Sequence, residues 1–206
     1  MSERGHRGGS GVGMETVNIV LCGLGGQGIL FMTKVLARAA LDQGLDIMGA
    51  ETHGMAQRGG SVVSHLRFGH VESSLVRSGT ARFLLALDAD EAYRNLPFLS
   101  ENGRLYVNAL EPGFPVPEVQ RYLDSRRAVC RAFPAEKTAA VLGAPMSANL
   151  ALLGFYSAFE DSPVSTDAIE KTIRDVSPER FREINLAVFR SGFERGRRMG
   201  AGLAGR

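Results

Sequence analysis

A glycine-rich turn near the start of the chain is the first feature that could bind a ligand. Gly23, Gly25 and Gly28 have the spacing G-x-G-x-x-G, and Gly26 and Gln27 fill its x-x pair. The turn lies between an apolar run and a segment with helical periodicity. Small residues let a backbone approach a ligand closely, and a helix N-terminus offers free N–H groups to a phosphate. The turn is therefore a candidate site for a phosphate-bearing ligand.

Two other interpretations of this turn remain open from the residues alone. Glu51 closes the next strand-like segment, about 20 residues beyond Gly28, where a carboxylate would hold the ribose of a dinucleotide. That placement favours an NAD-dependent oxidoreductase. Glycine also serves tight β–α turns that bind nothing, because it adopts backbone angles that other residues avoid.

A second polar segment, ETHGMAQRGGS at 51–61, follows the same strand-like run. Ligands of open α/β sheets bind at the edge where strands end. Thr52, Arg58, Gly59 and Gly60 are candidate binding residues here, and an ordinary solvated loop is the alternative. His53 titrates near neutrality when it is unperturbed, but an interface histidine is the simpler interpretation. We expect this loop to lie beside the glycine turn.

Asn149 is the third candidate, because it stands in an otherwise apolar helical segment, 146–160. A buried amide needs a hydrogen-bonding partner. That partner is either a ligand or, as the simpler interpretation, another part of the protein.

Several kinds of site are excluded by composition. Cys22 and Cys130 are the two cysteines, too few to supply the usual ligands of an iron–sulfur cluster. The sequence has no Cys-x-x-Cys pair, no His-Glu-x-x-His and no thiamine-type G-D-G…N segment, and its histidines lack ligand spacing. We therefore predict no metal site and identify no catalytic residue. A net charge of +2 does not favour nucleic acid as a partner.

The order of elements predicts an α/β protein. Strands are expected at 17–22, 45–51, 61–68, 82–87, 104–108 and 128–133. Helices are expected at 29–41, 91–99, 136–142, 146–160 and 166–176, with a long final helix after Ser177. Alternating strands and helices indicate a doubly wound, mainly parallel sheet, here with a helical C-terminal part.

The chain is expected to form a single domain. We predict a disordered leader at 1–15, the domain at 16–198 and a flexible tail at 199–206. The leader lacks the apolar core of a signal peptide, and no run approaches the ~18 apolar residues of a membrane span. Together with two cysteines that form no framework, this predicts a cytoplasmic location.

Two segments resemble a known family. NIVLCGLGGQGILFMTKVLARAAL (18–41) and GAETHGMAQRGGSVVSHLRFG (49–69) look like the gamma subunit or domain of 2-oxoacid:ferredoxin oxidoreductases. The stretch HGMAQRGGSVVSHLR is most similar to the beta subunit of the indolepyruvate type. The resemblance continues more weakly through LDADEA, RLYVN and NLALLG, so it covers most of the chain.

The resemblance implies a Rossmann-like fold and a division of labour. A large partner subunit would carry thiamine diphosphate, magnesium and the iron–sulfur clusters, and would pass electrons to ferredoxin. This chain alone would bind no cofactor, although coenzyme A could bind at the glycine turn. The expected activity, oxidative decarboxylation of an aryl 2-oxoacid to an acyl-CoA, would need both subunits. A free-standing NAD(P)-dependent oxidoreductase and a non-catalytic nucleotide-binding module are the alternatives.

Overall fold

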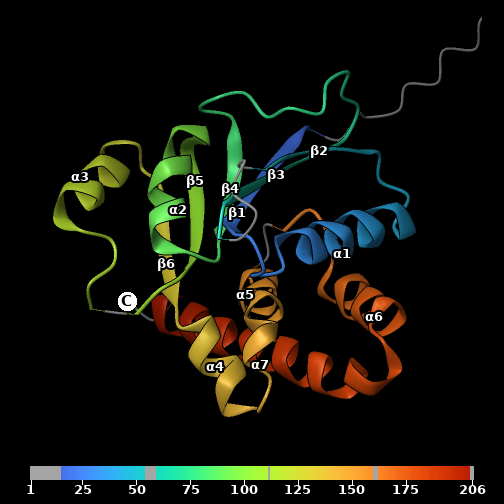
Figure 1. Cartoon of the computed structure of the whole chain (residues 1–206). Coiled ribbons are helices and arrows are strands. Elements are labelled where there is room, and N and C mark those ends of the chain that lie inside the picture. The colour runs from blue at the N-terminus through green and yellow to red at the C-terminus, as the bar shows by residue number, and fades with distance from the viewer. Residues whose placement is uncertain (1–14, 54–58, 111, 160–161, 205–206) are drawn as a thin grey trace, which may run out of the picture.

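The computed structural model describes residues 15–53, 59–110, 112–159 and 162–204. Its centre is one sheet in the order β2-β3-β1-β4-β5-β6 (Figure 1). The strands are β1 (Val17–Leu24), β2 (Ile47–His53), β3 (Ser61–Phe68), β4 (Ala81–Ala86), β5 (Leu99–Asn108) and β6 (Val129–Phe133). The six strands match the six expected segments, with ends that shift by a few residues.

The sheet is mainly parallel, as predicted. β4 pairs with β1 and with β5, and β6 with β5, all in parallel. β3 is antiparallel to both of its neighbours, β1 and β2. Within the described sheet, therefore, β3 alone runs against the others. The carboxyl ends of the remaining strands meet at one edge, where α/β proteins bind ligands.

Helices cover both faces of the sheet (Figure 1). They are α1 (Ile29–Asp42), α2 (Ala89–Asn95), α3 (Pro117–Ser125), α4 (Ala135–Val141), α5 (Ala148–Ser157), α6 (Thr166–Val176) and α7 (Glu179–Ala204), with short 3-10 turns η1 (Leu96–Phe98) and η2 (Pro145–Ser147). One core lies under α1, α5, α6 and α7, and the other lies under α2 and α3. Successive residues of β1 alternate between them: Ile19 and Leu21 face the first core, Val20 and Cys22 the second.

The final helix extends beyond residue 198, where the predicted domain ends. α7 continues to Ala204, and Met199 packs against the core. The flexibility expected for residues 199–206 stays a prediction. Of the predicted leader, 1–15, all but Glu15 lies outside the described residues.

α5 and α7 pack with their backbones in close contact. A Cβ atom built on Gly154 would lie 2.0 Å from the carbonyl oxygen of Phe189, and one on Gly192 would lie 2.0 Å from that of Ala151. Each glycine therefore admits the backbone of the opposite helix. This contact fixes the position of α5, which carries Asn149 at its start.

Cys22 is a structural thiol. It is fully buried on β1, and its sulfur lies 3.5 Å from the carbonyl oxygen of Glu91. Burial raises the pKa of this thiol, and the charges of Glu91 and Asp88 raise it further. Cys22 therefore stays protonated and chemically inert, whereas Cys130 is only partly buried. No described helix is long and apolar enough to cross a membrane.

We expect the buried imidazole of His65 to make the fold less stable in mild acid. It is buried on β3, and its Nδ1 accepts a hydrogen bond from the Val76 N–H (3.3 Å). Burial lowers its pKa below the ordinary 6.5, so below that pH the unfolded chain takes up a proton that the folded chain resists. The free energy of unfolding should therefore fall as the pH drops through this range.

Urea titrations at several pH values test this expectation. His65→Asn keeps an acceptor for the Val76 N–H but cannot be protonated, so its stability should fall less steeply between pH 7.5 and 5.5. Identical pH profiles for the wild type and the variant would show that His65 does not contribute to the pH dependence of the free energy of unfolding.

Candidate functional site

The glycine turn lies at the carboxyl edge of the sheet, between β1 and α1. Gly26 and Gly28 have φ values of +99° and +85°, which L side chains rarely adopt. The Gln27 N–H donates to the Leu24 carbonyl oxygen (3.1 Å), which closes the turn. Glycine is therefore required at two of its positions by backbone geometry alone.

The Gln27 side chain holds this turn against the next strand. Its Oε1 accepts from the Leu24 N–H (2.7 Å), and its Nε2 donates to the carbonyl oxygen of Leu87, just after β4 (3.4 Å). A Cβ on Gly23 would lie 2.7 Å from the same Oε1, so glycine at 23 leaves room for it. The amide thus shapes the turn from within.

Asn108, which we did not predict as a site residue, extends this amide network to the end of β5. Its Nδ2 donates to the same Leu87 carbonyl oxygen (3.1 Å), and its Oδ1 accepts from the Glu136 N–H at the start of α4 (3.1 Å). The network joins the ends of three strands and one helix. The signal in the sequence that could have identified Asn108 is an amide side chain at the end of a buried strand.

Asn149 also supports the glycine turn. It is buried at the start of α5, and its Nδ2 donates to the Gly28 carbonyl oxygen (3.2 Å). A Cβ on Gly28 would lie 2.4 Å from that Nδ2. The partner of this amide is therefore the turn, across 121 residues of sequence, as in the simpler of the two interpretations.

The N-terminus of α1 is open to an anion. Gly28 is its N-cap and provides no side-chain cap, and no acidic residue stands in the first turn. The first hydrogen bond within the helix runs from the Met32 N–H to Gly28 (3.1 Å), so the preceding N–H groups have no acceptor within the helix. Within the described part of the chain, a Cβ on Gly26 would meet nothing within 4 Å.

Beside the turn is a hollow of about 160 Å³, whose lining includes Gly26, Gln27, Asn108, Glu136 and Met146. A second hollow of about 400 Å³ shares Asn108 and Glu136 and adds Lys137. Together they form a cleft along the strand ends, with one carboxylate and one ammonium group on its α4 side.

The second predicted loop does lie beside the glycine turn, where the structure describes it. The Gly25 N–H donates to the Gly60 carbonyl oxygen (2.9 Å), and a Cβ on Gly25 would lie 3.6 Å from the Gly59 nitrogen. Residues 54–58, including Arg58, lie outside the described residues. Thr52 is exposed on β2, with its hydroxyl 3.4 Å from the Val63 carbonyl oxygen.

Glu51 is too far from the turn for the dinucleotide interpretation. β3 lies between β1 and β2, so Glu51 is two strand spacings, about 10 Å, from the strand that carries the turn. In dinucleotide-binding folds the corresponding strand pairs directly with the first one. The ribose-binding carboxylate predicted at Glu51 is thus misplaced.

Glu91 is a second residue that we did not predict to lie near the site. It is fully buried on α2 and accepts a hydrogen bond from the Ser61 hydroxyl (2.6 Å). It also pairs with Arg94. This carboxylate anchors the start of β3, next to Gly60. Elsewhere in the described ranges, no three His, Cys, Asp or Glu side chains are grouped as metal ligands would be.

A family model described as pyruvate ferredoxin/flavodoxin oxidoreductase matches residues 18–195. The chain belongs to this family. The match spans the glycine turn, the 51–61 segment, Asn149 and most of α7, so it covers every element that builds the site.

Curated relatives within the family match nearly end to end. The chain is 35% identical over 187 residues to indolepyruvate oxidoreductase subunit IorB of Methanothermobacter thermautotrophicus, covering 85% of this chain and 95% of that protein. The IorB subunit of Thermococcus kodakarensis is 33% identical, and the match covers 90% of this chain and 98% of that protein. 2-Oxoglutarate synthase subunit KorC of M. thermautotrophicus is more distant, at 27% identity, with 85% and 93% covered.

Two solved structures share the fold. A keto/oxoacid ferredoxin oxidoreductase gamma subunit from Geobacter sulfurreducens superposes with a TM-score of 0.68 at 28% identity, covering 87% of this chain and 98% of that one. A 2-oxoglutarate:ferredoxin oxidoreductase from Magnetococcus marinus, solved with 2-oxoglutarate, coenzyme A and succinyl-CoA, gives 0.72 at 19% identity, covering 89% of this chain and 31% of that one.

Membership of the pyruvate ferredoxin/flavodoxin oxidoreductase family confirms the predicted resemblance. The chain is a small subunit of the 2-oxoacid:ferredoxin oxidoreductase type. A free-standing NAD(P)-dependent oxidoreductase is not favoured, and the position of Glu51 gives the physical reason.

Proposed function

We propose that this chain is the small subunit of an indolepyruvate-type oxidoreductase, which converts an aryl 2-oxoacid to its acyl-CoA and passes electrons to ferredoxin. The observation that carries the proposal is the 35% identity to an IorB subunit across 95% of its length. The identity to a 2-oxoglutarate relative of similar coverage is lower, at 27%. The indolepyruvate type is therefore the better supported.

The partner in this proposal is a large subunit that holds thiamine diphosphate, magnesium and the iron–sulfur clusters. The chemistry of this chain supports that division. It has two cysteines, fewer than a cluster needs, and the Cys22 thiol is buried and protonated. We expect this chain to be inactive alone. The two cysteines form no disulfide in the described part of the chain, which also supports a cytoplasmic location.

Assembly is the first test. The chain and the large subunit from the same genome should co-purify as a complex of fixed stoichiometry, with iron and sulfide in the complex and none in this chain alone. Stoichiometric iron in the isolated chain, or no complex at any protein concentration, would contradict the proposal.

We further propose that the glycine turn receives an anionic group of coenzyme A. The uncapped α1 N-terminus supports this, because its free N–H groups and the helix dipole favour negative charge. Gly25, Gly26, Gly59 and Gly60 would let the ligand approach the backbone. Gly23, Gln27, Gly28 and Asn149 would shape the turn and not touch the ligand. Thr52 and Arg58 stay predicted binding residues at the edge of this site. Arg58 would pair with a phosphate or a carboxylate.

A charge placed at the turn tests the coenzyme site. Gly26→Asp adds a carboxylate at the uncapped helix N-terminus, and Asp tolerates positive φ better than most residues. Affinity of the assembled complex for coenzyme A, measured by calorimetry, should fall by about 100-fold, as expected for a like charge facing a phosphate.

Gly44→Asp is the matched control. Gly44 also has a positive φ (+75°) with nothing within 4 Å of its added Cβ, and it lies just beyond the opposite end of α1. Its coenzyme affinity should match the wild type. Equal affinities for all three proteins would place the coenzyme elsewhere.

A further inference from the structure

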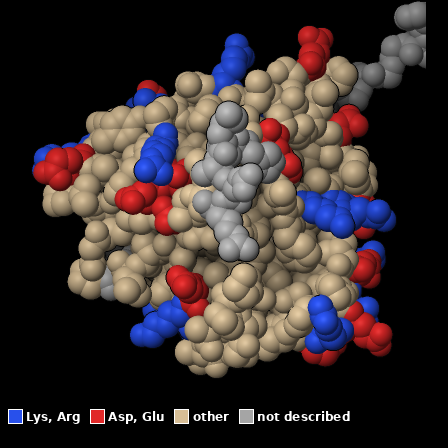
Figure 2. All heavy atoms as spheres, viewed as in Figure 1, with Lys and Arg blue, Asp and Glu red and all other residues tan. Residues whose placement is uncertain are grey.

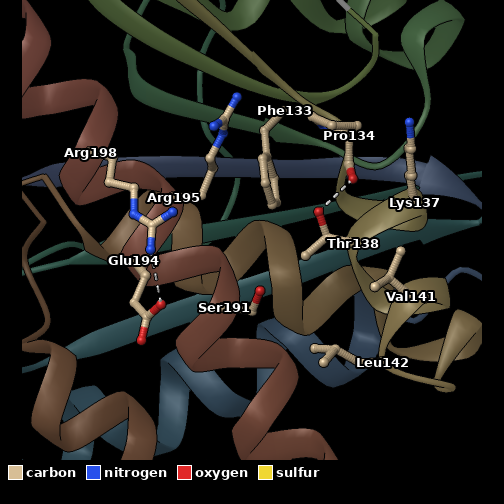
Figure 3. Close-up of a pocket in the computed structure, with 10 residues that line it drawn as sticks. All are labelled: Phe133, Pro134, Lys137, Thr138, Val141, Leu142, Ser191, Glu194, Arg195 and Arg198. Atoms are coloured by element: carbon tan, nitrogen blue, oxygen red, sulfur yellow. Dashed lines mark hydrogen bonds and ion pairs between the residues drawn. The ribbon is translucent and has the colours of Figure 1, made fainter.

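A hollow lies between α4 and the second half of α7 (Figure 3). It shares Pro134 and Lys137 with the 400 Å³ hollow at the strand ends. It measures about 380 Å³. Its charged lining is Lys137 from α4 and Glu194, Arg195 and Arg198 from α7. Three cations thus surround a space that contains one carboxylate.

The single carboxylate neutralises only part of this charge. Glu194 lies 3.9 Å from Arg198. Lys137 and Arg195 form no ion pair with any residue in the described part of the chain. In Figure 3 both side chains extend in the same direction, away from Glu194. Two cations are therefore available to a partner.

Apolar side chains adjoin this charge. Val141 and Leu142 line the hollow, and their exposed fractions are 79% and 37%. Met146 follows on η2 and is 79% exposed. Figure 2 shows the surface around the end of α4 without charged atoms. We call residues 141–146 the apolar ridge.

On the other side of the apolar ridge lies a larger hollow of about 520 Å³. None of the described residues that line it is charged, and Phe181 on α7 is 45% exposed there. An apolar surface of this kind next to a basic hollow is typical of a protein interface, because large exposed apolar patches are rare on proteins that act alone.

We propose that this surface binds an acidic, amphipathic segment of the large subunit. Its carboxylates would meet Lys137 and Arg195, and its apolar side chains would cover the apolar ridge. The inference rests on the proposed function. A second copy of this chain fits less well, because a two-fold contact through one patch sets the same cations against each other.

Charge reversal tests this inference. Lys137→Glu combined with Arg195→Glu should slow association with the large subunit by about tenfold at low salt and flatten its salt dependence, since rim charges act mainly on the association rate. Biolayer interferometry between 50 and 300 mM salt measures both effects. Arg77→Glu combined with Arg121→Glu is the control, because these exposed arginines lie outside the hollow. This control should associate as the wild type does.

The outcomes separate the inference from the proposed function. If the wild type binds the large subunit and the Lys137/Arg195 variant binds equally fast, the inference is wrong while the proposed function stands. If that variant binds the large subunit at the wild-type rate but loses affinity for coenzyme A, the inference is also wrong, because the hollow would then bind a phosphate ligand. If the wild type binds no large subunit, the proposed function itself fails. Val141→Ser should weaken the complex several-fold through faster dissociation, and an unchanged dissociation rate would remove the apolar ridge from the interface.

Discussion

Gly154→Ala is expected to lower the free energy of unfolding by about 3 kcal/mol, at the upper end of what overpacking usually costs. The new methyl group would lie 2.0 Å from the Phe189 carbonyl oxygen and 3.0 Å from the Phe193 nitrogen. Both atoms belong to the backbone of α7 and cannot rotate away. The two helices must therefore separate, which opens the larger core.

The control for this change is Gly202→Ala. Gly202 also lies in α7, but among the described residues a Cβ there would meet nothing within 4 Å. Its helix propensity should improve, so we expect a gain of about 0.5 kcal/mol. Urea unfolding followed by circular dichroism measures both variants. Equal midpoints for Gly154→Ala and Gly202→Ala would contradict the close contact of α5 with α7.

The same substitution should also affect the site. α5 begins with Ala148 and Asn149, and the Asn149 amide donates to the Gly28 carbonyl oxygen. A shift of α5 away from α7 therefore moves the support of the glycine turn. If the glycine turn receives coenzyme A, as we propose, Gly154→Ala should weaken coenzyme binding as well as folding, although Gly154 lies in the helical layer, behind the turn.

Much of the fold could be predicted from periodicity. β3 and α6 begin and end at the predicted residues. Alternation marks β3 locally, and Asp167 and Glu170, three residues apart, mark the start of α6. The direction of β3 was missed, although the short connection at 54–60 signals it. A parallel crossover needs a dozen or more residues, so β2 and β3 had to be antiparallel. That one feature also moves Glu51 away from the turn.

The site could be predicted only where its signal is local. The signal for Gly26 and Gly28 is local, because a turn with positive φ favours glycine wherever it occurs. The contact of Asn149 with Gly28 is not local, since it joins residues 121 apart. The same holds for Asn108 and Glu91, whose partners come from other elements. Tertiary packing decides which polar residues meet, and no spacing in the sequence records it.

Activity should require both subunits. Measuring it most directly tests the central claim that this chain is the small subunit of an indolepyruvate-type oxidoreductase. The purified chain, its large subunit and a mixture of the two are each supplied with indolepyruvate, coenzyme A and an acceptor dye. We expect the mixture alone to reduce the dye, with a rate that requires both substrates. Phenylpyruvate should also serve, and pyruvate and 2-oxoglutarate should be poor substrates. NAD(P)-linked turnover by the isolated chain, or a mixture that oxidises pyruvate or 2-oxoglutarate faster than indolepyruvate, would contradict the account.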